Sequence, residues 1–137
     1  MQFSTRSEYG LRALTVLGNH YGSGPVPLRR VAEHEGLSED YLEQLFADLK
    51  RAHLLRTVRG AGGGYLLAKP PEELNLREIV TALEGDIAPC DCVREDGDAT
   101  CLRGQTCLVQ AVWFRLRDSM NDILEGITLS DVLSGKL

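Results

Sequence analysis

The chain has 137 residues, 43% of them hydrophobic, which suits one small domain that folds without disulfides. No apolar run approaches the roughly 18 residues of a membrane span and no secretory leader is present, so we expect a cytoplasmic protein without membrane contact. The net charge of −5 is unevenly placed, because residues 1–69 carry +2 and residues 70–137 carry −7. The basic first half keeps nucleic acid open as a partner.

The first two predicted elements are helices separated by a turn. Thr5 and Glu8 have the spacing of a capping box, and apolar residues then recur on one side, which predicts a helix from about Thr5 to Tyr21. A short second helix is expected to begin at Pro27 and to stop near Gly36.

A third helix follows almost at once, with Ser38 as its predicted N-cap and an apolar stripe beyond it. The pattern of helix, tight turn and helix is typical of DNA-binding proteins, in which the later helix enters the major groove. Glu43 could accept a hydrogen bond from a cytosine amino group, although an ordinary exposed helix position is the alternative interpretation. The candidate DNA contacts of this helix are Ser38, Glu39, Asp40, Tyr41, Glu43, Gln44 and Arg51.

Two short strands, Leu54–Val58 and Tyr65–Ala68, are predicted next, joined by a glycine-rich loop. Arg59 and Gly60 at the tip of this hairpin are candidate DNA contacts, because glycine lets the backbone approach another chain and arginine binds phosphate. A nucleotide-binding phosphate loop is the rival interpretation, but it requires a following helix, whereas a strand follows here. The sequence therefore predicts a wing.

Leu76–Leu83 is a further predicted helix, and an acidic 23-residue loop, Glu84–Thr106, follows it. Beyond the loop, apolar residues recur with heptad spacing over about nineteen residues, which favours a homodimer over packing within one chain. A two-fold dimer would match a palindromic operator in double-stranded DNA. The residues of this heptad seam are Val109, Trp113, Leu116, Met120, Ile123 and Ile127.

All four cysteines lie in or next to the acidic loop, at positions 90, 92, 101 and 107. Clustered thiolates suit an iron–sulfur cluster, zinc or copper(I), but their spacing matches structural zinc templates badly. Redox-active thiols remain a third interpretation. An enzyme such as a thiol oxidoreductase is disfavoured, because the chain has no C-x-x-C motif and no histidine in a triad-like context.

Four segments carry the signatures of one protein family: Ser38–Phe46, Val58–Leu67, Cys107–Trp113 and Ile127–Leu133. On these segments the chain resembles the IscR and NsrR type of winged-helix regulators along its full length. The resemblance implies a dimeric transcription factor that carries a 2Fe-2S or 4Fe-4S cluster and controls cluster assembly, nitric oxide responses or related redox genes. By position it implies that Glu43 contacts a base, that Arg59 acts in the wing, and that the cluster ligands include Cys92, Cys101 and Cys107.

The fourth ligand stays open, because the sequence departs from the IscR pattern C-x5-C-x5-C-x2-H. Eight residues separate the first two of the three corresponding cysteines here, and Gln110 stands where the histidine would be. A neutral amide is a poor ligand for iron. NsrR-like members supply a carboxylate from the partner subunit at the place of Glu8, whose alternative role is the capping box. Cys90 is the remaining candidate.

Together these patterns predict a mainly α fold with a small β-hairpin wing: a winged helix-turn-helix domain over 1–83, a cysteine-bearing cluster loop over 84–106 and a dimerisation helix with a C-terminal segment over 107–137. The predicted function is an iron–sulfur-dependent repressor that senses cluster status, redox state or nitric oxide. The alternatives are a cofactor-free regulator that uses cysteine oxidation or a partner protein, and a zinc-stabilised regulator.

Overall fold

The computed structural model describes residues 2–95 and 107–137. Its fold is mainly helical with one antiparallel hairpin, as the sequence predicts. The elements in chain order are α1 (Thr5–Asn19), α2 (Leu28–Glu35), α3 (Glu39–Arg51), β1 (Leu55–Val58), β2 (Gly64–Leu67), the 3-10 turn η1 (Pro71–Glu73), α4 (Leu76–Glu84), the 3-10 turn η2 (Asp91–Val93), α5 (Gln110–Glu125) and α6 (Leu129–Ser134).

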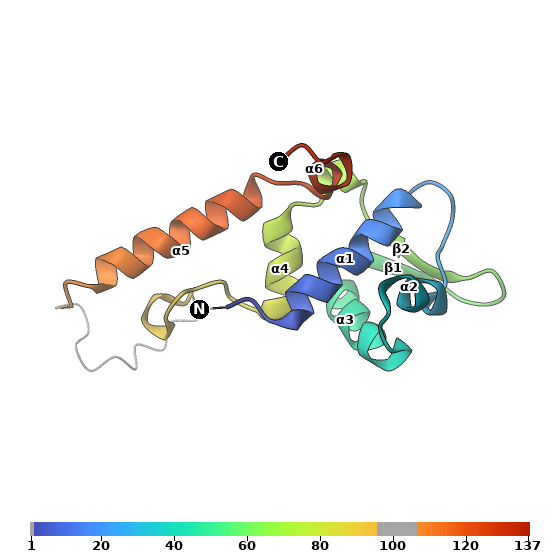
Figure 1. Ribbon diagram of the computed structural model, residues 1–137, viewed down its shortest axis with the longest axis horizontal. Helices are drawn as coiled ribbons and strands as arrows, with labels where there is room; N and C mark the ends of the chain where they lie inside the picture. Colours follow the sequence, from blue (N-terminus) through green and yellow to red (C-terminus); the bar gives the residue numbers. More distant parts are fainter. Residues whose placement is uncertain (1, 96–106) are drawn as a thin grey trace.

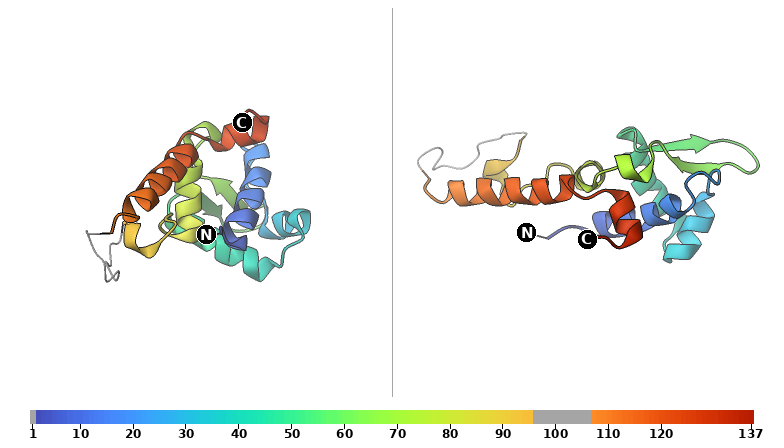
Figure 2. Two further views of the ribbon diagram at one scale, coloured as in Figure 1. Left: turned by 60° about the vertical axis from the view of Figure 1, so that its left-hand side comes forward. Right: turned by 90° about the horizontal axis from the view of Figure 1, so that it is seen from above.

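The molecule consists of a body and an arm (Figure 1). Helices α1 to α4, α6 and the hairpin form the body, and α5 extends from it. Seen from above, the hairpin and the N-terminal end of α5 point in opposite directions (Figure 2). Among the described residues, η2 packs along α5. The wing and the cysteine segment, which consists of residues 85–95 with Cys90 and Cys92, therefore lie at opposite ends of the protein.

The core lies where α1 packs against α2, α3, α4 and α6. Each fully buried leucine or phenylalanine contributes about 1.5–3 kcal/mol relative to exposure, so these helices support one another. The fully buried large side chains of this core include Leu14, Leu42, Leu45, Phe46, Leu49, Leu74, Ile79 and Leu129.

The helix-turn-helix has the local chemistry that the sequence predicts. Gly36 ends α2 in the left-handed conformation (φ 67°), which glycine adopts without steric cost. Ser38 is the N-cap of α3, and its hydroxyl accepts a hydrogen bond from the Tyr41 amide at 3.2 Å. Pro27 is the N-cap of α2, so the helix begins at Leu28, one position later than predicted.

The N-terminal capping box is a wrong prediction. The N-cap of α1 is Ser4, whose hydroxyl accepts from the Arg6 amide, and Thr5 is already helical. Ser4 is held in place by Glu84, which accepts hydrogen bonds from the Ser4 amide at 2.7 Å and from its hydroxyl at 2.6 Å. Because Glu84 is distant in sequence, local spacing could not reveal this cap. Glu8 is exposed on the first turn of α1 and has no capping role.

Helix α6 is a further element that the periodicity analysis missed. Thr128 and Asp131 form a complete capping box at its start. The Leu129 amide donates to the Leu74 carbonyl at 2.8 Å, and Asn75 pairs with Thr128 in a β-bridge. The chain therefore returns to the body after α5.

The wing, which is the β1–β2 hairpin, is attached to the helices of the body through the segment that joins α1 to α2. In the β1–β2 ladder Leu55 pairs with Leu67 and Val58 with Gly64. The amide of Tyr65 donates to the Val26 carbonyl at 2.8 Å, and the Val26 amide donates back to Tyr65 at 3.0 Å. A Cβ at Gly64, where φ is +152°, would lie 2.2 Å from the Val26 carbonyl oxygen.

Replacing Gly64 with alanine should therefore detach the wing. The backbone clash and the strained φ together predict a loss of about 2–4 kcal/mol of unfolding free energy and a melting temperature lower by roughly 10 °C. Gly62→Ala is the matched control, since Gly62 also has positive φ but an added Cβ would meet nothing within 4 Å. Equal melting temperatures of the two variants, measured by circular dichroism, would contradict this account of the wing.

Helix α5 leaves much of its heptad seam uncovered in the single chain. Val109, Leu116 and Ile123 are 52%, 43% and 63% exposed, respectively. Ile127, beyond the end of the helix, packs against the core. No helix among the described residues has the length and apolar character needed to cross a membrane.

Candidate DNA interface and cysteine site

Helix α3 presents its polar side to solvent. Its apolar stripe is buried against the body, and the acidic residues of its first turn lie where the positive end of the helix dipole stabilises them. Five of the predicted DNA contacts are exposed side chains of α3: Glu39, Asp40, Glu43, Gln44 and Arg51. Ser38 is also exposed, but its hydroxyl is engaged in the cap.

Tyr41 differs from the other predicted contacts because it is packed against α1. Its ring meets the Tyr9 ring edge-on, with centroids 6.3 Å apart. Its hydroxyl lies 3.4 Å from the Thr5 hydroxyl. Tyr41 thus packs the start of α3 against α1. A direct contact of Tyr41 with DNA stays a prediction.

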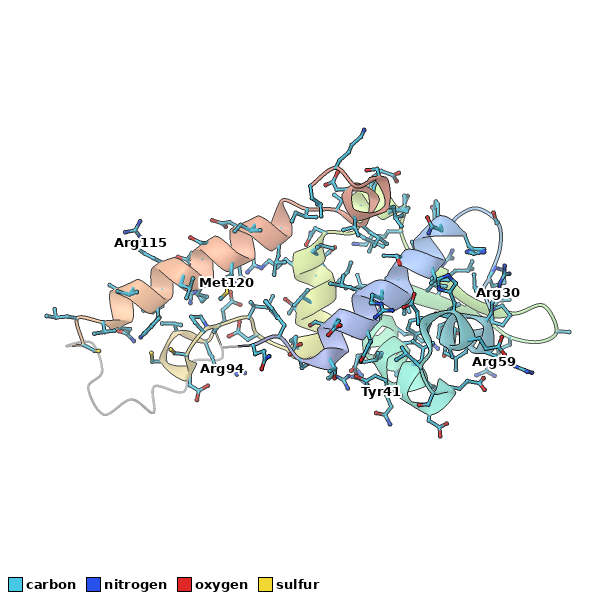
Figure 3. All side chains as sticks on the ribbon, viewed as in Figure 1. Arg30, Tyr41, Arg59, Arg94, Arg115 and Met120 are labelled. Atoms are coloured by element: carbon cyan, nitrogen blue, oxygen red, sulfur yellow. The ribbon has the colours of Figure 1, made fainter. Side chains whose placement is uncertain are left out.

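The basic residues of the interface lie on three elements. Arg51 is exposed in the last turn of α3, where its guanidinium donates to Asp48 at 2.9 Å. Arg59 and Gly60 are exposed in the wing loop. Arg30 on α2 lies at the same end of the molecule as Arg59 (Figure 3). Sequence reasoning overlooked Arg30, although the first helix of a helix-turn-helix commonly crosses the DNA backbone.

Glu43 lies close to the wing as well as on the exposed side of α3. Burial raises the pKa of Tyr65 in β2, and the negative charge of Glu43 raises it further. The Tyr65 ring packs on the buried Phe46 ring, with centroids 4.8 Å apart. This stacking fixes the wing relative to α3, so the Glu43 carboxylate and the wing have a defined relative position.

Replacing Glu43 and Arg59 separately with alanine should have different effects on DNA binding. Glu43→Ala is expected to relax discrimination at one base pair by about 1–3 kcal/mol, because a base-specific acceptor is lost. Arg59→Ala is expected to weaken binding to all sequences and to reduce the slope of log affinity against log salt by about 1. Binding of single-substituted duplexes at several salt concentrations checks both, and matching profiles of the two variants would refute the assignment.

The first turn of α5 joins the cysteine segment to Cys107. Gln110 donates its backbone amide to the Cys107 carbonyl at 3.3 Å and its side-chain amide to the Cys92 carbonyl at 3.3 Å. Cys90 is the N-cap of η2, and Cys92 lies within it. The thiols of Cys90, Cys92 and Cys107 are half-buried. One residue, Gln110, therefore binds the backbone carbonyls of two cysteines that are fifteen positions apart in the chain.

Cys101, the third predicted ligand, lies outside the described residues. In the part of the chain that the structure describes, no three cysteine, histidine or acidic side chains lie close enough to hold a metal ion. The cysteines are thus not joined there by Glu8, which lines an apolar pocket of about 250 Å³ with Phe3, Leu11 and other residues of α1, α4 and α5.

Polar side chains of α5 hold the cysteine segment in place. Arg117 donates to the Val93 carbonyl at 2.9 Å, and Asn121 donates to the Ile87 carbonyl at 3.2 Å. Val93 and Ile87 are themselves buried, and so is Asn121. Sequence reasoning missed Arg117 and Asn121, because their partners are backbone carbonyls that no motif identifies.

Comparison with known proteins places the chain in a family. The family model described as "Rrf2: Iron-dependent Transcriptional regulator" matches residues 3–135. The chain is 35% identical over 136 residues to the regulator IscR of Pectobacterium atrosepticum, covering 99% of this chain and 81% of that one.

Two solved structures have the same fold along nearly the whole chain. IscR of T. potens superposes with a TM-score of 0.80 at 37% identity and covers 100% of this chain and 89% of its own. CymR of B. subtilis, described as a global cysteine regulator, has a TM-score of 0.78 at 36% identity, covering 98% and 97%. Because the family is one of transcriptional regulators, the enzyme alternative is excluded. The chain belongs to the Rrf2 family of transcriptional regulators.

Proposed function

We propose that this protein is an iron–sulfur-dependent repressor that binds a palindromic operator in double-stranded DNA as a homodimer, in the cytoplasm. The observation that supports the cofactor is that Gln110 binds the backbone carbonyls of both Cys92 and Cys107. The resemblance to IscR regulators implies target genes of cluster assembly or stress defence.

The donor chemistry of the residues around Gln110 supports an iron–sulfur cluster. Thiolates are soft donors that suit such clusters, and both sulfurs are on backbone that α5 already holds. Cys92 and Cys107 would be two ligands, with Cys101 as the third. When bound, a cluster would supply iron that reacts with oxidants or nitric oxide.

The fourth ligand is most simply Glu8 of a partner subunit. Its carboxylate is exposed and, among the described residues, makes no hydrogen bond or ion pair. It lines a pocket beside Leu124 of α5, the helix that carries the exposed seam. A second copy docked on this seam would bring its own cysteine segment to this side of the body. Cys90 and Gln110 are the remaining candidates, although the Gln110 amide nitrogen already binds the Cys92 carbonyl.

DNA binding follows from the exposed face of α3 and the wing. In this arrangement α3 enters the major groove, while Arg51, Arg59 and Arg30 meet phosphates. Dimerisation through α5 sets the distance between the two copies of α3. This distance decides whether both copies can bind half-sites that lie one helical turn of DNA apart.

A cofactor-free thiol regulator is the second candidate, favoured by the likeness to CymR, which is described as a cysteine regulator. The half-buried thiols of Cys90 and Cys107 would then respond to oxidation directly.

Anaerobic purification followed by visible absorption, electron paramagnetic resonance, and iron and sulfide analysis separates the two candidates. The proposal expects coloured protein with iron and acid-labile sulfide in similar amounts, and an operator affinity that changes when both are removed. Protein that binds DNA specifically but holds neither iron nor sulfide, even after reconstitution, would support the thiol regulator instead.

A further inference from the structure

The end of α4 and the beginning of α1 form a polar junction at the point where the cysteine segment starts. Glu84, the last residue of α4, accepts hydrogen bonds from the Ser4 amide and hydroxyl and from the Ser7 hydroxyl at 2.6–2.7 Å. Burial raises the pKa of Glu84, but the hydrogen bonds from Ser4 and Ser7 outweigh it and leave the pKa lowered. Gly85 follows at φ 87° and ψ −152°, a conformation that favours glycine.

Arg6 extends this junction to helix α3. Its Nε donates to the carbonyl of Leu83, in the last turn of α4, at 3.1 Å. Its Nη2 forms an ion pair with Asp48 of α3. The other carboxylate oxygen of Asp48 accepts from Arg51 at 2.9 Å. A single half-buried guanidinium thus joins the end of α4 to a candidate phosphate contact.

We propose that Arg6 is a positioning residue that transmits the placement of the α4 terminus to α3 and to Arg51. This inference rests on the proposed function, because it gives the route by which the state of the cysteine segment reaches the DNA interface. The segment leaves α4 at Gly85 and is tied to α5 through Arg117 and Asn121. A shift of the segment therefore acts first on Leu83 and Glu84, and Arg6 carries that shift to Asp48.

The geometry of the guanidinium explains why arginine stands at this position. Arginine presents donors along several edges of a rigid plane, so one side chain can hold a carbonyl and a carboxylate in fixed relative positions. Lysine has the same charge but carries a single point-like ammonium group. Arg6→Lys should therefore keep the attraction to Asp48 and lose the fixed link to Leu83.

The test measures operator affinity by fluorescence anisotropy for cluster-loaded and cluster-free protein, with a duplex selected from random sequence by the unaltered protein. In Arg6→Gln and Arg6→Lys the affinity ratio between the two states should fall to within about twofold of one, whereas coupled sites typically differ by roughly 5–150-fold. Arg115→Gln is the matched control, since Arg115 is an exposed arginine of α5 (Figure 3) and should keep the full ratio.

A second measurement does not depend on the cofactor. Amide hydrogen exchange across residues 39–51 of cluster-free protein should become at least about threefold faster in Arg6→Gln, because α3 loses the polar link to α4 that Arg6 provides. The double-mutant cycle of Arg6→Gln with Asp48→Asn should show that the two effects on exchange are not additive.

These results separate failure of the proposed function from failure of the role of Arg6. Equal operator affinities of cluster-loaded and cluster-free unaltered protein would overturn both. If the affinities of the two states differ in the unaltered protein and differ as much in Arg6→Gln, only the role of Arg6 is overturned. A full affinity difference in Arg6→Lys would show that the link to Leu83 is dispensable, and would also overturn the role of Arg6.

Discussion

Replacing Ile123 with glutamate is expected to turn the protein into a monomer and to lower operator affinity on the order of 100-fold or more, because one half-site contact is lost. Ile123 is 63% exposed in the single chain. A charge there costs the monomer little, since exposed substitutions usually change stability by less than about 0.5 kcal/mol. In a dimer seam the same carboxylate would be buried opposite its own copy without a partner, which is strongly unfavourable.

Size-exclusion chromatography with light scattering checks the oligomeric state, and fluorescence anisotropy checks the affinity. Leu137→Glu is the matched control, because Leu137 is 81% exposed and does not belong to the heptad seam. Leu116→Glu should reproduce the Ile123 effect, since the two residues belong to the same seam. A dimeric Ile123→Glu variant with unchanged affinity would refute dimerisation through this face.

The elements that the sequence predicted well are those whose signals are local. The Ser38 cap and the apolar stripe that follows it define α3, and Gly36 defines the end of α2. These features depend on residues within one or two turns of each other. The same holds for the wing, whose two short strands around a glycine-rich loop were predicted to within one residue at each end.

The misses share a different cause, which is dependence on distant partners. The α1 cap is at Ser4 because Glu84 holds that residue from the end of α4. Helix α6 has only six residues, too few for periodicity, and it is stabilised by its pairing with the segment around Asn75. Its capping box, Thr128 to Asp131, was the local signal that could have revealed it.

The candidate site likewise has features that the sequence predicted and features that it could not predict. Residue types and positions predicted soft ligands next to a dimerisation helix, and exposed acidic side chains on α3. They could not predict that Gln110 would join Cys92 to Cys107, or that Arg117 would hold the Val93 carbonyl. These contacts use backbone carbonyls, which every residue carries, so composition gives no information about them. The three-segment division and the ligand set therefore stay predictions.

Replacing Cys107 with serine is expected to lower the iron and acid-labile sulfide content at least about tenfold, because a hydroxyl is a hard and largely protonated donor at neutral pH. Cys92→Ser should have the same effect, since its backbone is held to the same residue, Gln110. Cys90→Ser is the comparison, and retained iron in this variant would leave Glu8 of the partner subunit as the favoured fourth ligand. Glu8→Ala should then change the visible spectrum without abolishing it.

The cysteine variants also test whether the cofactor controls DNA binding. The operator affinity of Cys107→Ser should equal that of cluster-stripped unaltered protein and should no longer change when oxidant is added. Melting temperatures should differ little among cluster-free forms, because the Cys107 side chain is half-buried at the end of the arm, away from the core. Iron retained in both Cys92→Ser and Cys107→Ser, or an unchanged response to oxidant, would exclude the cysteine segment as the sensor and leave DNA binding by α3 and the wing as an independent property.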